Sequence, residues 1–116
     1  MSLSSREILS KAPVVPVLVI EDANDAVPIA KALVAGGLPV LEITLRSAAA
    51  EESIKRIIAE VPDAITGAGT VINAKQMERM AKIGCAFAVS PGHTKSLLKA
   101  AKDTGVPLLP GAGTPS

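Results

Sequence analysis

Five short apolar runs at nearly equal intervals constrain the fold more than any other feature of this sequence. They begin at positions 14, 40, 64, 86 and 107, so that successive starts lie 26, 24, 22 and 21 residues apart. Each interval has room for one helix and two loops, which is the spacing of βα units. The runs are rich in Val, Ile and Leu, which is typical of strands buried on both faces of a parallel sheet. The predicted strands are 14–20, 40–45, 64–71, 86–90 and 107–110.

The segments between the runs carry helix signals. Ser4 and Glu7 have capping-box spacing ahead of a short helix over about 6–11. Asp25 is the expected cap of the next helix, with Pro28 in its first turn. Three later helices are predicted to begin at the caps Ser47, Asn73 and Thr94, and the last two of them to end at Gly84 and Gly105.

Helical spacing also predicts which side chains of these three helices face the sheet. The predicted set is Ile54, Ile57, Ile58 and Val61; Met77, Met80 and Ala81; and Leu97, Leu98 and Ala101. Two pairs four residues apart, Glu51 with Lys55 and Glu52 with Arg56, predict ion pairs on an outer face. No linker or low-complexity stretch interrupts the series, so residues 1–116 are predicted to form a single α/β domain.

Composition excludes several classes of function. Twelve basic against eleven acidic side chains leave a net charge of +1, which favours neither nucleic acid nor membrane as a partner. Phe87 is the one aromatic residue, so a base-stacking platform is excluded. With one cysteine and one histidine, Cys85 and His93, we expect no disulfide and no metal site. The absence of a long apolar segment or signal pattern predicts a soluble, cytoplasmic protein.

Ligands of parallel α/β folds bind at the carboxyl ends of the strands. In the second run Glu42, Thr44 and Arg46 alternate with aliphatic residues, so they are expected to share one face. Burying a charge costs several kcal/mol unless the charge is paired. The spacing alone leaves three alternatives open: a Glu42–Arg46 ion pair, a solvated sheet edge, or a functional site.

The other strand exits carry weaker signals. Gly67 and Gly69 permit either the close approach of a ligand or tight packing, of which packing is favoured, and Thr70 adds a hydroxyl. Pro91 belongs to a turn after the fourth run. None of the lysines is a convincing Schiff-base nucleophile, because they fall within predicted helices or at a helix end; Lys95 is near a strand exit, but in the first turn of a helix.

Several of these motifs occur together in a specific order and spacing. They are VVPVLVI (14–20), KALVAGG (31–37), LEITLR (41–46), GAGTV (67–71) and SPG (90–92). With them the chain resembles, from about residue 5 to 114, the 2-keto-3-deoxy-6-phosphogluconate (KDPG) aldolase family. Members of that family also act as 4-hydroxy-2-oxoglutarate aldolases.

The resemblance implies a (βα)8 TIM barrel that assembles as a homotrimer and needs no metal or organic cofactor. It implies class I, Schiff-base cleavage of a small 2-keto sugar acid phosphate to pyruvate and glyceraldehyde 3-phosphate. Glu42 matches the catalytic glutamate, a general acid/base that works through water. Arg46 matches the arginine that binds the pyruvate-end carboxylate, Thr70 a substrate-contacting threonine, and Pro91 a residue that lines the pocket.

One departure from the family pattern limits these expectations. The family's Schiff-base lysine lies on the sixth strand and its phosphate site on the loops of strands seven and eight, whereas this sequence ends after the fifth run. We therefore expect the N-terminal part of a barrel, with five strands, four helices and a short leading helix, which is inactive alone. The alternatives are a non-catalytic open α/β sheet or assembly piece, or the sister aldolase for the galactonate-derived substrate, in which the arginine corresponding to Arg46 is less typical.

Overall fold

Strands and helices alternate along the chain, as the spacing of the apolar runs predicts. The computed structural model describes residues 4–10, 14–92 and 94–110. The strands are β1 (Val17–Leu18), β2 (Val40–Thr44), β3 (Ile65–Gly69), β4 (Phe87–Ser90) and β5 (Leu108–Pro110). The helices are α1 (Ser5–Ser10), α2 (Ala26–Ala35), α3 (Ala50–Glu60), α4 (Ala74–Ile83) and α5 (Lys95–Thr104), with a 3₁₀ turn η1 (Ala23–Asp25) before α2.

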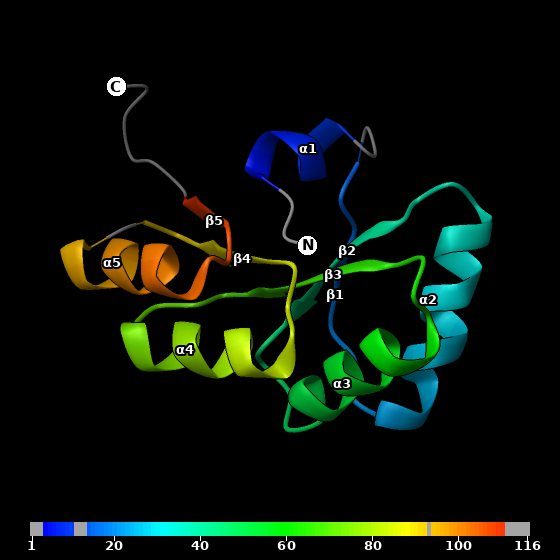
Figure 1. Ribbon diagram of the computed structural model, residues 1–116. Helices are drawn as coiled ribbons and strands as arrows, with labels where there is room; N and C mark the ends of the chain where they lie inside the picture. Colours follow the sequence, from blue (N-terminus) through cyan, green and yellow to red (C-terminus); the bar gives the residue numbers. More distant parts are fainter. Residues whose placement is uncertain (1–3, 11–13, 93, 111–116) are drawn as a thin grey trace.

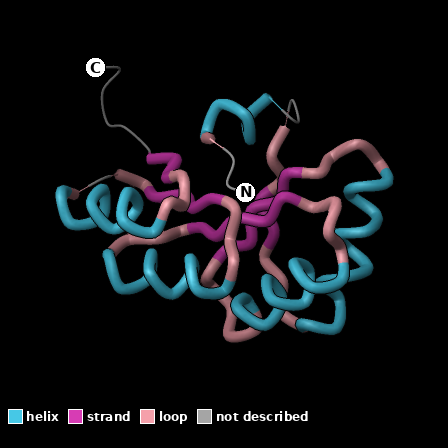
Figure 2. The backbone as a smooth tube through the Cα atoms, in the orientation of Figure 1, coloured by secondary structure: helices cyan, strands magenta, loops and turns pink. Residues whose placement is uncertain are grey.

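The five strands form one parallel sheet in the order β1-β2-β3-β4-β5, so each strand pairs with the next strand of the chain. Helices α2 to α5 cover one face of the sheet, and α1 lies on the other (Figure 1). The tube view shows the same layers (Figure 2). Consecutive βα units of a (βα)8 barrel have this arrangement, so the predicted fold class is confirmed.

The first strand is much shorter than the predicted run 14–20. Pro16 has no amide proton to donate to a ladder, which suits its place beside an edge strand. Its carbonyl still accepts a hydrogen bond from the Glu42 N–H at 3.0 Å, so the pairing with β2 continues around the proline. Beyond the paired residues, Val19 is half exposed.

The main core lies between the sheet and α2–α5. Leu41, Ile43 and Ala68 contribute from the strands and are fully buried. Most of the predicted sheet-facing side chains of α3, α4 and α5 are buried as well, while Ile58 and Ala81 are half-buried. The expectation for Leu98 is wrong, because 43% of it is exposed. Helix α5 packs against α4 on one side, and among the described residues no further helix follows it.

Most predicted helix boundaries are confirmed by their cap geometry. Ser4 and Glu7 form the reciprocal capping box, with backbone-to-side-chain distances of 3.3 and 3.1 Å. Asn73 Oδ1 accepts from the Gln76 N–H at 2.8 Å, and Thr94 Oγ1 accepts from the Leu97 N–H at 3.1 Å. Both α4 and α5 end at a left-handed glycine, as predicted. No helix among the described residues is long and apolar enough to span a bilayer.

Two cap predictions need correction. Ser47 does not cap α3, which begins at Ala50; its hydroxyl instead donates a 2.5 Å hydrogen bond to the carbonyl of Ile20. Asp25 stands at the start of α2, but its side chain makes no cap hydrogen bond. The carboxylate of Asp22 accepts from the Asn24 N–H and begins the 3₁₀ turn. The Ser47 hydroxyl is thus used by a contact with the end of β1, whereas at α2 the side-chain cap belongs to Asp22 and to the 3₁₀ turn that precedes the helix.

The face of the sheet that carries α1, here called the inner face, has a second, smaller core. Ile8 of α1 is fully buried against Val40 of β2 and Phe87 of β4. These residues lie toward the amino ends of their strands. The short leading helix therefore covers the inner face at its amino end and leaves the carboxyl ends of the strands uncovered.

Leu97 and Leu98 provide a matched test of the helix packing. Leu97 is buried at 2% exposure, so Leu97→Ala is expected to lower the free energy of unfolding by about 2–5 kcal/mol. Leu98→Ala is expected to cost less than about 1 kcal/mol, because the side chain already contacts solvent. Urea denaturation of the two variants measures the difference, and equal costs would contradict the packing of α5 described here.

Candidate active site

Side chains on β2 alternate between the two faces of the sheet. Leu41 and Ile43 enter the core beneath the helices, so Glu42 and Thr44 lie on the inner face. Thr44 is 5% exposed and Glu42 is half-buried. Arg46 lies in the turn after the strand, where it is exposed. The alternation predicted for Glu42 and Thr44 is thus present, whereas Arg46 lies beyond the strand's end.

The Glu42 carboxylate occupies space that glycine leaves open on the neighbouring strand. The backbone register pairs Glu42 with Gly67 and Thr44 with Gly69. A Cβ atom on Gly69 would overlap Oε2 of Glu42, so the carboxylate lies directly over this glycine. The Glu42 side chain therefore leans toward the carboxyl end of the sheet. The space at Gly67 is filled in the same way by the ring of Phe87.

Burial raises the pKa of the Glu42 carboxyl group. Val17 on β1 and Gly67 on β3 are its register partners, and neither can offer a side-chain hydrogen bond. The ion pairs within the described residues join Arg56 to Glu52 and Arg79 to Glu51, so none bridges Glu42 to Arg46. Of the three alternatives for this run, the structural ion pair is therefore excluded by the geometry.

The loop that carries Arg46 is attached to the end of β1. Ser47, the next residue, donates its hydroxyl proton to the Ile20 carbonyl at 2.5 Å. Beside it, the Leu45 N–H donates to the Gly69 carbonyl at 2.6 Å and extends the β2–β3 pairing past the strand end. These two bonds hold the turn on both sides, while the guanidinium of Arg46 remains exposed and available to an anion.

Thr70 and Pro91 follow β3 and β4 directly, and both are exposed. Because β2, β3 and β4 are parallel neighbours, their carboxyl ends meet at one edge of the sheet. Pro91 also borders a cavity of about 280 Å³ between the exits of β3 and β4 and the start of α5. The structure thus brings Glu42, Arg46, Thr70 and Pro91 to one edge of the sheet.

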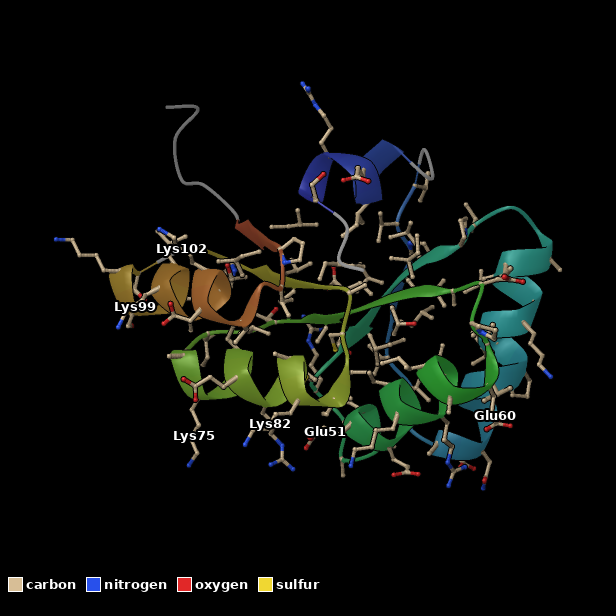
Figure 3. All side chains as sticks on the ribbon, viewed as in Figure 1. Glu51, Glu60, Lys75, Lys82, Lys99 and Lys102 are labelled. Carbon is tan, nitrogen blue, oxygen red and sulfur yellow. The ribbon has the colours of Figure 1, made fainter. Side chains whose placement is uncertain are left out.

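No described lysine lies on the inner face. Lys75 and Lys82 extend from α4 away from the sheet (Figure 3), and Lys99 and Lys102 are exposed on α5. The lysines at 31, 55 and 95 are likewise exposed on helices, and Lys11 lies outside the described residues. Within the described part of the chain, the strand exits therefore offer a carboxylate, a guanidinium and hydroxyl groups, without an amine nucleophile.

Thiol and metal chemistry also find no support in the described ranges. Cys85 is buried, and desolvation raises the pKa of its thiol to about 12, so the reactive thiolate is scarce at neutral pH. No three His, Cys, Asp or Glu side chains from residues 4–10, 14–92 and 94–110 lie together in a way that could hold a metal ion. His93 falls outside these ranges.

Two features of the site were not assigned by the sequence pattern. Gly69 provides the space for the Glu42 carboxylate, and the Thr44 hydroxyl is buried on the same face without a hydrogen-bond partner. The register between β2 and β3 relates these positions, and a single sequence does not reveal that register. The spacing of Gly67 and Gly69 was a usable signal of close packing, which is what both glycines provide.

Glu42→Gln is expected to change the pH dependence of stability. The raised pKa means that the folded chain favours the protonated form, so stability falls as pH rises from the unfolded pKa through the folded one. The neutral amide does not have this penalty. We expect Glu42→Gln to match the parent in urea unfolding below about pH 4 and to be more stable at pH 7. The exposed Glu78→Gln is the control, and an equal gain for Glu42→Gln at both pH values would contradict the prediction.

Alanine at the two β3 glycines distinguishes the two close contacts. Gly67→Ala meets the rigid Phe87 ring and is expected to cost about 1–3 kcal/mol of unfolding free energy. Gly69→Ala meets the end of a flexible side chain, so it is expected to cost less. Adding Glu42→Ala is expected to relieve the cost at Gly69 but leave the cost at Gly67 unchanged. Urea denaturation of the five variants, which are the three single variants and the two double ones, tests this. Failure of Glu42→Ala to relieve Gly69→Ala would refute the contact.

Comparison with known proteins identifies relatives across nearly the whole chain. The family model described as KDPG and KHG aldolase matches residues 5–116. A curated 2-dehydro-3-deoxy-phosphogluconate aldolase from Pseudoalteromonas atlantica is 57% identical over 109 residues, which cover 94% of this chain and 51% of that protein. The chain thus spans about half the length of the curated relatives it matches.

Solved structures give the same result. The 2-keto-3-deoxy-6-phosphogluconate aldolase of Zymomonas mobilis ZM4, with 3-phosphoglycerate, superposes with a TM-score of 0.88 at 55% identity, over 94% of this chain and 52% of that one. The KDPG aldolase of Legionella pneumophila, with pyruvate captured as a covalent carbinolamine intermediate, has a TM-score of 0.88 at 42% identity, over 93% and 52%. From the match of the family model and these similarities, the chain belongs to the KDPG and KHG aldolase family.

Proposed function

We propose that the protein is a class I aldolase that cleaves 2-keto-3-deoxy-6-phosphogluconate to pyruvate and glyceraldehyde 3-phosphate, with 4-hydroxy-2-oxoglutarate as a further substrate. The observation that carries the proposal is the Glu42 carboxylate on the inner face, leaning toward the edge of the sheet where Arg46 is exposed. The pyruvate carbinolamine captured in the Legionella pneumophila relative supports the same chemistry.

Glu42 has the role of general acid and base in this proposal. A lysine amine and the C2 carbonyl of the substrate condense to an imine with loss of water. Glu42 accepts the C4 hydroxyl proton through a water molecule as the C3–C4 bond breaks. The electron pair of that bond passes to the imine to give an enamine, and C4 leaves as the aldehyde carbon of glyceraldehyde 3-phosphate. A proton returns to C3, and water hydrolyses the imine to release pyruvate. The raised pKa of Glu42 suits a group that both accepts and returns a proton.

Arg46 binds the substrate carboxylate through its guanidinium, which presents paired donors to a planar anion. The hydrogen bonds on either side of its turn support this role, because they fix the backbone from which the side chain extends. Thr70 contributes a hydroxyl contact to the substrate and Pro91 an apolar wall, both from adjacent strand exits. No metal ion or organic cofactor takes part in this scheme.

The imine lysine and the phosphate site are assigned to segments outside this chain. The exposure of the described lysines on the outer helices supports that assignment. In the proposal the 116 residues form one domain, the N-terminal part of an eight-stranded barrel. The half-exposed Val17 and Val19 beside the open edge of β1 favour an inner face that further strands close. The assembled protein is proposed to be a cytoplasmic homotrimer.

Borohydride trapping tests the proposed function. The full-length protein with pyruvate and borohydride is expected to form a reduced covalent adduct, whereas the 116-residue chain is not. In the full-length protein Glu42→Gln is expected to keep the adduct while aldol cleavage falls by roughly 10²–10⁴-fold, the usual contribution of a positioned acid–base group. Mass spectrometry locates the adduct, and a coupled assay follows pyruvate release.

Lys95→Arg is the control variant, because Lys95 is the described lysine closest to a strand exit. It is expected to retain both the adduct and the activity. An adduct on any lysine of the short chain would show that the site assignment is wrong. Absence of both adduct and cleavage in the full-length protein would reject the aldolase function itself.

A further inference from the structure

One buried hydroxyl group on the inner face has no hydrogen-bond partner. Among the described residues, the buried side-chain oxygens without a partner belong to Thr44, Ser53 and Thr66. Thr66 alternates with Gly67 on β3 and lies on the helix side of the sheet, and Ser53 is buried on α3. Thr44 is on the inner face, where 95% of it is buried. A buried hydroxyl that lacks a partner is unfavourable, so its retention at this place needs a reason.

The polar group beside the Thr44 hydroxyl on the inner face is the Glu42 carboxylate. Thr44 is the register partner of Gly69, and the Glu42 carboxylate lies over Gly69. The hydroxyl and the carboxylate therefore occupy neighbouring positions at the same height on the sheet. The backbone of Glu42 lies two residues earlier on β2, but its side chain reaches forward to Gly69. Rotation about one side-chain bond moves a threonine hydroxyl between staggered positions without changing the backbone.

We propose that Thr44 is a positioning residue for Glu42. Its hydroxyl turns toward the ionised carboxylate, donates a hydrogen bond to it, and holds it over Gly69 at the carboxyl edge of the inner face. An ionised carboxylate is a strong acceptor, so the bond forms in the charged state and is weaker in the protonated state. This inference rests on the proposed function only for the catalytic consequence; the contact itself does not depend on it.

No charged side chain among the described residues pairs with Glu42, so a single hydrogen bond from Thr44 would have a measurable effect on its carboxylate. The charged residue nearest along the chain is Arg46, in the turn after β2, which is exposed and makes no ion pair with Glu42. β1 presents Val17 and β3 presents glycines at the paired positions, and none of these titrates. The leading helix α1 carries Arg6 and Glu7, both exposed, and Glu7 is engaged in the capping box with Ser4.

The direct test is the titration of Glu42 in the full-length protein, followed by carbon-13 NMR of labelled glutamate and assigned with Glu42→Gln. Thr44→Val keeps the shape of the side chain and removes the hydroxyl. It is expected to raise the Glu42 pKa by about one pH unit, because the charged form loses a donor. Thr44→Ser is expected to restore the parent value. Thr66→Val, which removes an equally buried and unpartnered hydroxyl on the other face, is expected to leave the pKa unchanged.

Kinetics provide the second measurement. Thr44→Val is expected to lower kcat roughly tenfold to a hundredfold, with little change in KM, and to move the acidic limb of the kcat profile to higher pH. Thr44→Ser restores both properties, and Thr66→Val matches the parent. A structural role alone predicts instead that both valine variants are at least as stable and fully active, since each loses only an unpaired hydroxyl.

The possible outcomes separate the two proposals. An unchanged Glu42 titration in Thr44→Val overturns the positioning role, and so does a defect that Thr44→Ser does not repair or that appears only in KM. A parent protein that shows neither pyruvate trapping nor cleavage rejects the aldolase function, and the NMR titration then decides the Thr44–Glu42 contact by itself.

Discussion

The lack of side chains at two glycines of β3 determines what the inner face of the sheet can hold. The ring of Phe87 from β4 lies over Gly67, and the carboxylate of Glu42 from β2 lies over Gly69. A side chain at either position would fill the space on which its neighbour depends. Because β3 lies between β2 and β4, it makes an apolar contact with one neighbour and a polar contact with the other. The two contacts are only two residues apart on the same strand.

This change divides the inner face along the strand direction. Toward the amino ends, Ile8 of α1 packs with Val40 and Phe87 in a buried apolar cluster. Toward the carboxyl ends, Glu42 and Thr44 bring polar groups into a partly buried environment. The apolar half strengthens the electrostatic interactions of the polar half. A carboxylate in surroundings of low polarity is poorly solvated, so it interacts strongly with the few partners it has. The helices on the other face of the sheet contribute to the larger core, and none of the four site residues lies on them.

Features that depend on local sequence were predictable, and those that depend on distant partners were not. The strand and helix order follows from the apolar spacing, and Asn73, Thr94 and Gly84 act within one turn of their own helix. Ser47 and Glu51 instead bond to Ile20 and Arg79, which lie 27 and 28 residues away. In the site, the face of Glu42 followed from strand alternation. Its contact with Gly69 required the register between two strands, which alternation does not contain.

The strand order has a consequence for how such a chain is made. Within the five described strands each one pairs with the next along the chain, so none of these four pairings must wait for a segment synthesised much later. Each new loop closed along the way is short, and its entropic cost is correspondingly small. A growing chain can therefore add each of these βα units to an existing edge as it emerges. The edge that carries Glu42 and Arg46 needs only β1 to β3 for its strand pairing, so it can form before α5 and β5 are synthesised.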